Sequence, residues 1–181
     1  HHFQPQVMLG ETQLCGVEAL VRWNHPRFGI LPPNHFVPMA EQRGFINELT
    51  RKVLDMALAQ LQAWDLAGLK VPRVAVNVSP VEIRANFAEM IESALYRHNI
   101  APDRLELEIT ESTLTSDGIE TMHLLTRLKQ LGVGIAVDDF GVGYSSLAQL
   151  HRLPIDCLKI DRSFVQDIES SACDLAIVQA V

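Results

Sequence analysis

The most informative stretch of the chain is GIAVDDFGVGYSSL, residues 134–147. Four residues suited to a buried β-strand, 134–137, lead directly into two adjacent carboxylates, Asp138 and Asp139, and then into a loop with glycines. Two bare anions cannot be buried without a large free-energy cost, so this pair must be hydrated, paired with bases or neutralised by a metal ion. The stretch therefore predicts a strand that ends at a functional site, where other polar residues meet the two aspartates.

The composition predicts one domain over residues 1–181, because 48% hydrophobic residues can bury a substantial core. His1 and His2 are consistent with a purification-tag remnant and carry no weight for the fold. The net charge of −7 argues against a DNA or RNA polymer as partner. No run reaches the roughly 18 to 20 apolar residues of a membrane span. Three cysteines without C-x-x-C spacing favour a reducing compartment, so a cytoplasmic domain is expected even if a longer protein is anchored elsewhere.

Strands alternate with helices along the chain, which predicts a largely parallel sheet. The alternating or continuous apolar pattern predicts six strands, at 3–9, 16–23, 73–79, 104–110, from 134 onward and at 157–163. Helical spacing of apolar residues, together with capping and stop signals, predicts helices at 34–41, 46–66, 81–97, 118–131, 145–153 and 172–181.

The polar residues of these strands share one face of the predicted sheet. If the apolar positions pack under helices, the opposite face carries Glu18, Asn77, Glu108, Asp138 and Lys159. A doubly wound sheet would cover that face with helices and leave the charges poorly housed, whereas a barrel collects them at its centre. We therefore predict an α/β fold of the TIM-like barrel type. A complete barrel takes about 250 residues, so six of its eight strands are expected in this chain.

Five short motifs in sequence order resemble the EAL domain family, bacterial phosphodiesterases that hydrolyse cyclic di-GMP. They are Glu18-x-Leu20-x-Arg22, Asn77-Val78-Ser79, the EITES run at 108–112, the DDFG run at 138–141 and the LKID run at 158–161. The opening Gln4-Pro5 also fits. The resemblance implies a TIM-like barrel whose first strand runs antiparallel to the others.

The resemblance also implies roles for particular residues. The ligands of a divalent metal ion would be Glu18, Asn77, Glu108 and Asp138, with Asp138 and Asp139 both facing a second ion. Lys159 corresponds to the catalytic lysine that holds or helps deprotonate the attacking water, and Glu111 to the glutamate that steadies the loop after the fifth strand. The positions that correspond to substrate contacts are Gln4, Leu20, Arg22 and Asp161.

The chemistry of this residue set agrees with such a reaction. Hard oxygen ligands without histidine or thiolate favour Mg²⁺ or Mn²⁺ over zinc. Two such ions about 3.5 to 4 Å apart can generate hydroxide and stabilise an in-line phosphodiester displacement. The expected reaction is attack of water on one phosphorus of cyclic di-GMP, which gives linear pGpG.

Two departures from the family pattern bear on activity. Val142 stands where the family usually has a small residue, often threonine, and the family's glutamate on strand seven and glutamine on strand eight have no counterpart in the 181 residues. Two open sheet edges would result, so we expect the 181-residue chain to be inactive or weakly active unless a partner closes the barrel.

Other interpretations stay open at this stage. A catalytically silent receptor for cyclic di-GMP or a protein-docking module is the main alternative, and another carboxylate-metal barrel enzyme, such as an enolase-like lyase, is a third. Asn77 alone could cap a helix, and Lys159 or Arg22 could be structural. Family members often dimerise and lie beside sensory or GGDEF domains, which are therefore the expected partners.

Overall fold

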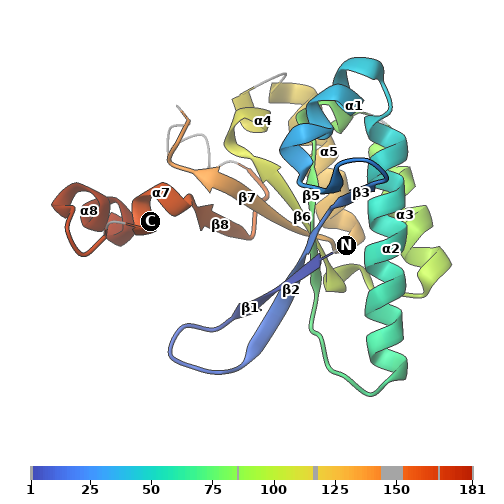
Figure 1. Cartoon of the computed structure of the whole chain (residues 1–181), viewed down its shortest axis with the longest axis horizontal. Coiled ribbons are helices and arrows are strands. Elements are labelled where there is room, and N and C mark those ends of the chain that lie inside the picture. Colours follow the sequence, from blue (N-terminus) through green and yellow to red (C-terminus); the bar gives the residue numbers. More distant parts are fainter. Residues whose placement is uncertain (1, 85, 116–117, 144–152, 167, 181) are drawn as a thin grey trace.

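The computed structural model describes residues 2–84, 86–115, 118–143, 153–166 and 168–180, and its centre is a curled sheet (Figure 1). The six strands run in the order β1-β2-β5-β6-β7-β8, with bounds His2–Val7, Leu14–Leu20, Val74–Val78, Leu105–Thr110, Gly134–Phe140 and Cys157–Ile160. β1 is antiparallel to β2, and the other neighbouring strands are parallel. The predicted α/β architecture, with six barrel-type strands and an antiparallel first strand, is confirmed.

Three long helices cover one face of this sheet (Figure 1): α2 Ile46–Leu66, α3 Phe87–His98 and α5 Gly118–Leu131. Their apolar sides are fully buried against the strands, as Leu54, Leu58 and Ile91 show. The strands supply Leu107 and Ile135 to the same core. Burial of this apolar surface is the main force that holds the helices on the sheet.

The opposite face of the sheet carries the charged side chains, as the strand period of two requires. On β6, Glu106 and Glu108 alternate with the core residues Leu105 and Leu107. Glu106 pairs with Arg73, Nη1 to Oε2 2.8 Å, so this buried carboxylate belongs to an internal ion pair.

The shorter elements lie around the sheet. They are β3 Trp23–His25, β4 Gly29–Leu31, η1 Pro33–His35, α1 Val37–Arg43, η2 Pro80–Glu82, η3 Pro102–Arg104, α4 Glu111–Thr115, α7 Arg162–Gln166 and α8 Ala172–Ala180. In the described part of the chain, no helix combines the length and the apolar character that a membrane crossing requires.

Several predicted element boundaries are wrong. The second strand does not continue to Trp23, because that residue belongs to a separate hairpin, β3–β4. His25 Nδ1 accepts the amide hydrogens of Arg27 and Phe28 at 3.1 and 3.2 Å, which closes the hairpin turn. The helix expected over 34–41 is α1, displaced to Val37–Arg43.

Two further boundaries differ for local reasons. The last strand ends at Ile160 because Asp161 Oδ1 accepts the amide hydrogen of Ser163 at 2.9 Å and so caps α7. The helix expected over 81–97 begins only at Phe87, since the short η2 turn and an irregular Ile83 precede it. The helix expected at 145–153 falls, except for its last residue, outside the described residues.

Candidate functional site

Five polar side chains converge at the carboxyl ends of the parallel strands. Each comes from a different strand: Glu18 from β2, Asn77 from β5, Glu108 from β6, Asp138 from β7 and Lys159 from β8. The register aligns Asn77 with Glu108, and Asp138 with Thr110. Because all five point to the face that the helices leave free, the curl of the sheet turns their charged ends toward one another.

The Lys159 ammonium is the centre of this cluster. Its Nζ lies 2.7 Å from Glu108 Oε1, 3.3 Å from Glu18 Oε2 and 3.4 Å from Asp138 Oδ1. Asn77 Nδ2 donates to Glu18 Oε1 at 2.8 Å and joins the fifth residue to the others. The residues that the motifs singled out are therefore direct neighbours.

The environment of the cluster shifts its protonation equilibria. Burial raises the pKa of the Glu108 carboxyl to about 7, although the Lys159 ammonium opposes this shift. Burial alone would lower the pKa of Lys159, but the hydrogen bond to Glu108 and the nearby carboxylates raise it above its ordinary value. Lys159 is therefore an ammonium ion at neutral pH, able to donate hydrogen bonds.

The cluster contains oxygen atoms suited to a hard cation. Glu108 Oε2 is buried and has no hydrogen-bond partner among the described residues. Carboxylate and amide oxygens are the ligands that Mg²⁺ and Mn²⁺ prefer. In the described ranges, however, no three acidic, histidine or cysteine residues are already arranged around a common point, and the Lys159 ammonium lies between the carboxylates.

Asp139 lies beside the cluster rather than within its ion pairs. Its backbone is left-handed, with φ of 53°, which turns the chain at the end of β7. Burial raises the pKa of Asp139, and the neighbouring carboxylates of Asp138 and Asp161 raise it further. Hydrogen bonds from Ser163 lower the pKa of Asp161. Two carboxyls this close favour a proton or a cation between them.

Glu111 holds the loop that follows Asp139. Its Oε2 accepts the amide hydrogens of Gly141 at 3.1 Å and Gly143 at 3.0 Å. A side chain at position 143 would collide with Glu111, since a Cβ there would lie 2.7 Å from Glu111 Cδ. Gly143 is thus needed for the close approach of the loop backbone to the carboxylate.

A family model described as "EAL domain" matches residues 1–181. The chain belongs to the EAL domain family. This agrees with the resemblance that the five motifs indicated.

Two relatives of this EAL domain are named as cyclic di-GMP phosphodiesterases. It is 42% identical over 181 residues to MucR of Pseudomonas aeruginosa, named a bifunctional diguanylate cyclase/cyclic di-GMP phosphodiesterase, covering 99% of the chain and 26% of MucR. It is 45% identical over 181 residues to the cyclic di-GMP phosphodiesterase NbdA of the same organism, covering 99% of the chain and 23% of NbdA. The chain therefore spans about a quarter of the length of these relatives.

A solved structure shows the same fold. The PaMucR phosphodiesterase in complex with c-di-GMP has 42% identity and a TM-score of 0.93, with 99% of this chain and 73% of that chain covered.

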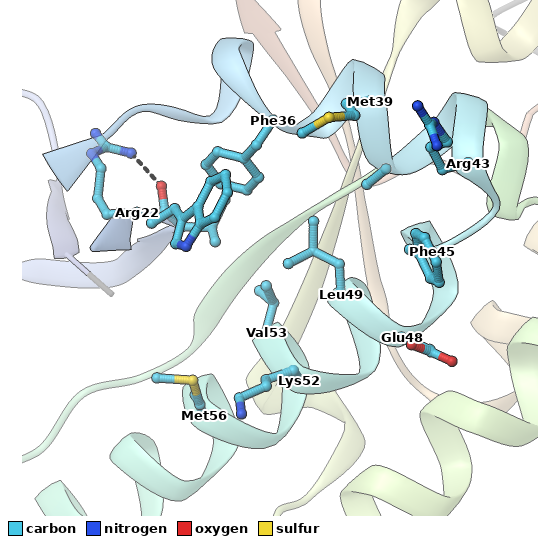
Figure 2. Close-up of a pocket in the computed structure, with 13 residues that line it drawn as sticks. Arg22, Phe36, Met39, Arg43, Phe45, Glu48, Leu49, Lys52, Val53 and Met56 are labelled. Atoms are coloured by element: carbon cyan, nitrogen blue, oxygen red, sulfur yellow. Dashed lines mark hydrogen bonds between the residues drawn. The ribbon is translucent and has the colours of Figure 1, made fainter. Parts of the chain in front are cut away.

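The four residues predicted to contact substrate are more widely separated in this EAL domain than the five clustered residues. Gln4 pairs in register with Glu18, and Asp161 lies beside Asp139. Leu20 ends β2. Arg22 Nη1 donates to the carbonyl oxygen of Val21 at 2.7 Å, and both residues line another groove (Figure 2).

That groove has a volume of about 710 Å³ and lies between α1, α2 and the start of β3 (Figure 2). Apolar side chains line most of it, among them Trp23, Leu49 and Met56. None of the five clustered residues lines it. The groove is therefore separate from the candidate site.

The motif analysis missed one buried polar group that follows the Asn77-Val78-Ser79 motif, the carboxyl of Glu82. It accepts hydrogen bonds from Thr50 Oγ1 at 2.7 Å and from the amide of Ser79 at 3.3 Å. The spacing Ser79-x-x-Glu82 is a capping-box signal that the sequence contains. Its contact with Thr50 spans 32 residues and could not be inferred from spacing.

Proposed function

We propose that this EAL domain hydrolyses cyclic di-GMP to linear pGpG. The observation that carries this proposal is the convergence of Glu18, Glu108 and Asp138 on the Lys159 ammonium, with Asn77 bonded to Glu18. The names of MucR and NbdA support the same activity and substrate. Because the chain spans only about a quarter of the length of MucR and NbdA, the activity of the whole protein belongs to the proposal as well.

The proposed cofactor is Mg²⁺ or Mn²⁺, in a site of two ions. Glu18, Asn77, Glu108 and Asp138 would hold one ion, and Asp138 with Asp139 would hold the second. When bound, the ions would lower the pKa of water and stabilise negative charge on a phosphate. The buried, unpartnered Glu108 Oε2 in the described structure fits this assignment.

The chain's own residues would align the reactants. The Lys159 ammonium donates hydrogen bonds and can hold the attacking water beside the phosphorus, while Glu111 fixes the loop that follows Asp139 through the amides of Gly141 and Gly143. Attack of water breaks the phosphorus–oxygen bond to one ribose, and the departing oxygen takes up a proton. Gln4, Leu20, Arg22 and Asp161 are the proposed substrate contacts, with Arg22 swinging from Val21 toward a phosphate.

Product analysis tests the proposal directly. Cyclic di-GMP is incubated with Mg²⁺ or Mn²⁺ and with either the 181-residue chain or the full-length protein, and pGpG is measured. We expect the full-length protein to hydrolyse cyclic di-GMP only with the ion present and to lose this activity in Glu18→Ala, while the 181-residue chain shows little or no hydrolysis. Hydrolysis that persists in Glu18→Ala would exclude the proposed site.

A catalytically silent receptor for cyclic di-GMP is the second candidate, since the Lys159 ammonium lies between the carboxylates that would hold the ions. Binding of cyclic di-GMP without turnover in the full-length protein, with either ion present, would support the receptor instead of the enzyme. We also propose that this EAL domain forms a homodimer in the cytoplasm and adjoins a sensory or GGDEF domain; the name of MucR, a bifunctional diguanylate cyclase/cyclic di-GMP phosphodiesterase, supports such a neighbour. Sedimentation of the full-length protein tests the dimer.

A further inference from the structure

Glu82 is a carboxyl group buried where a carboxyl is costly. Only 1% of the residue is exposed. Its Oε2 accepts both the Thr50 hydroxyl and the Ser79 amide, and its Oε1 has no hydrogen-bond partner among the described residues.

No cation compensates this carboxyl in the described part of the chain. The charged group that acts on it is another acid, Glu41 of α1, which accepts a hydrogen bond from Ser79 Oγ at 2.6 Å. α2 contributes the uncharged Thr50. Burial raises the pKa of Glu82 to about 7, and Glu41 adds to the rise. A buried acid without a base destabilises a fold, and such violations are expected mainly where function requires them.

The position of Glu82 suggests which function it serves. The ladder between β5 and β6 ends at the pair Val78 and Ile109, so the next amide, that of Ser79, needs another acceptor. The Glu82 carboxyl is that acceptor, and its hydrogen bond from Thr50 connects the end of β5 to α2. Asn77 lies two residues before Ser79 and projects to Glu18.

We propose that Glu82 is a positioning residue for Asn77, which it acts on through Ser79 and the end of β5. The carboxyl sets how far the strand extends before the chain turns into η2, and thereby the height of the Asn77 amide above the sheet. The link to Asn77 is structural, and only its consequence for metal affinity and turnover rests on the proposed function.

Side-chain amide NMR tests the positioning without any ion or substrate. In the ¹⁵N-labelled 181-residue chain, the Asn77 Nδ2 resonances are assigned with Asn77→Asp. Glu82→Ala is expected to shift them, because the Ser79 amide loses its acceptor. Glu82→Gln keeps a carbonyl oxygen for the same bonds and is expected to restore them. Glu106→Gln, which removes a different buried carboxylate, is the matched control.

Mn²⁺ titration adds a second measurement. Loss of a group that orients a ligand typically weakens metal binding about 10- to 100-fold, which is the expectation for Glu82→Ala, with Glu82→Gln within about threefold of wild type. Thr50→Val removes one donor to Glu82 and is expected to shift the Asn77 resonances in the same direction as Glu82→Ala. If Glu82→Ala does not fold, the Asn77 resonances of Thr50→Val still test the positioning role.

The outcomes separate this inference from the proposed function. Asn77 resonances that stay in place in both Glu82→Ala and Thr50→Val, while the melting temperature falls, would overturn the positioning role. Resonances that move as expected would support the positioning even if the full-length protein never hydrolyses cyclic di-GMP, a result that would contradict the phosphodiesterase alone.

Discussion

The Lys159 ammonium lies 2.7 Å from the Glu108 carboxylate, although β7 separates the strands that carry them. Side chains on alternate strands of a flat sheet would be about 10 Å apart at their bases. The curl of the sheet brings their ends together over the small residue Ala136, which is aligned with Glu108. The contact is therefore a direct consequence of barrel-like curvature.

Lys159→Met removes the cation that the carboxylates of Glu18, Glu108 and Asp138 share. We expect turnover of cyclic di-GMP to fall at least about 100-fold, because no ammonium holds the water. The ion-free variant should lose about 3 kcal/mol of unfolding free energy, since three anions remain without their partner. Mn²⁺ should then raise its melting temperature more than that of wild type. A melting temperature that Mn²⁺ leaves unchanged in both proteins would contradict the assignment of these carboxylates as ligands.

Glu111→Ala releases the backbone of the loop after Asp139. Since two amide hydrogen bonds are lost, we expect a fall in turnover of about 10- to 100-fold, measured as pGpG formation. Gly143→Ala should have a similar effect although Glu111 is retained, because the new Cβ would collide with its carboxylate.

Glu92→Ala is the matched control for the loop variants, since Glu92 is an exposed glutamate on α3. Turnover close to wild type is expected for it. If Glu111→Ala were as active as this control, Glu111 would have no part in holding a productive loop.

The sheet and the cluster could be predicted because both follow from a period of two. Glu106 and Glu108 lie on one face of β6, as alternation requires, and the resemblance of the EITES run to the family placed Glu108 in the candidate site. The end of β2 could not be predicted from the same pattern. Its alternation continues through Trp23, and the strand is broken by tertiary and turn contacts, including those of the His25 ring.

Contacts between segments far apart in the chain also could not be predicted from the sequence. The capping box of Ser79 and Glu82 is visible in the sequence, but Thr50 and Glu41 reach it from two helices that precede it by more than 25 residues. The hydrogen bond from Arg22 to the carbonyl oxygen of Val21 likewise could not be inferred from the motif that contains Arg22. Side-chain rotamers and tertiary partners therefore had to come from the structure.

Arg104→Lys tests a part of the fold remote from the chemistry. The guanidinium of Arg104 binds Asp65 through Nη2 at 2.9 Å and the carbonyl oxygens of Val71 at 2.7 Å and Pro72 at 3.2 Å. It fastens the loop between α2 and β5 to the start of β6. A lysine cannot reproduce this fork, so we expect the melting temperature to fall by roughly 5 °C. Turnover measured well below that temperature should be unchanged, and a large loss would mean that the loop acts on the site.

Glu82→Gln should change how stability depends on pH. Burial raises the pKa of Glu82 from an ordinary 4.5 to about 7, so between these values the folded chain keeps a proton that the unfolded chain has lost. This group's contribution to the unfolding free energy is fully present below pH 4.5 and is lost as the pH rises through 7.

The pKa difference corresponds to a loss of about 3 kcal/mol of unfolding free energy. Because glutamine does not titrate, Glu82→Gln should not show this loss. Urea unfolding of both proteins at pH 5, 6, 7 and 8 measures the difference. We expect the unfolding free energy of Glu82→Gln minus that of wild type to become more positive as pH increases, with most of the change complete by pH 8. Other titrating groups, Glu108 included, are common to both proteins and cancel in this difference. Parallel curves for the two proteins across this range would mean that Glu82 is already ionised in the folded chain at pH 5, and that its burial is compensated by groups other than Thr50 and Ser79.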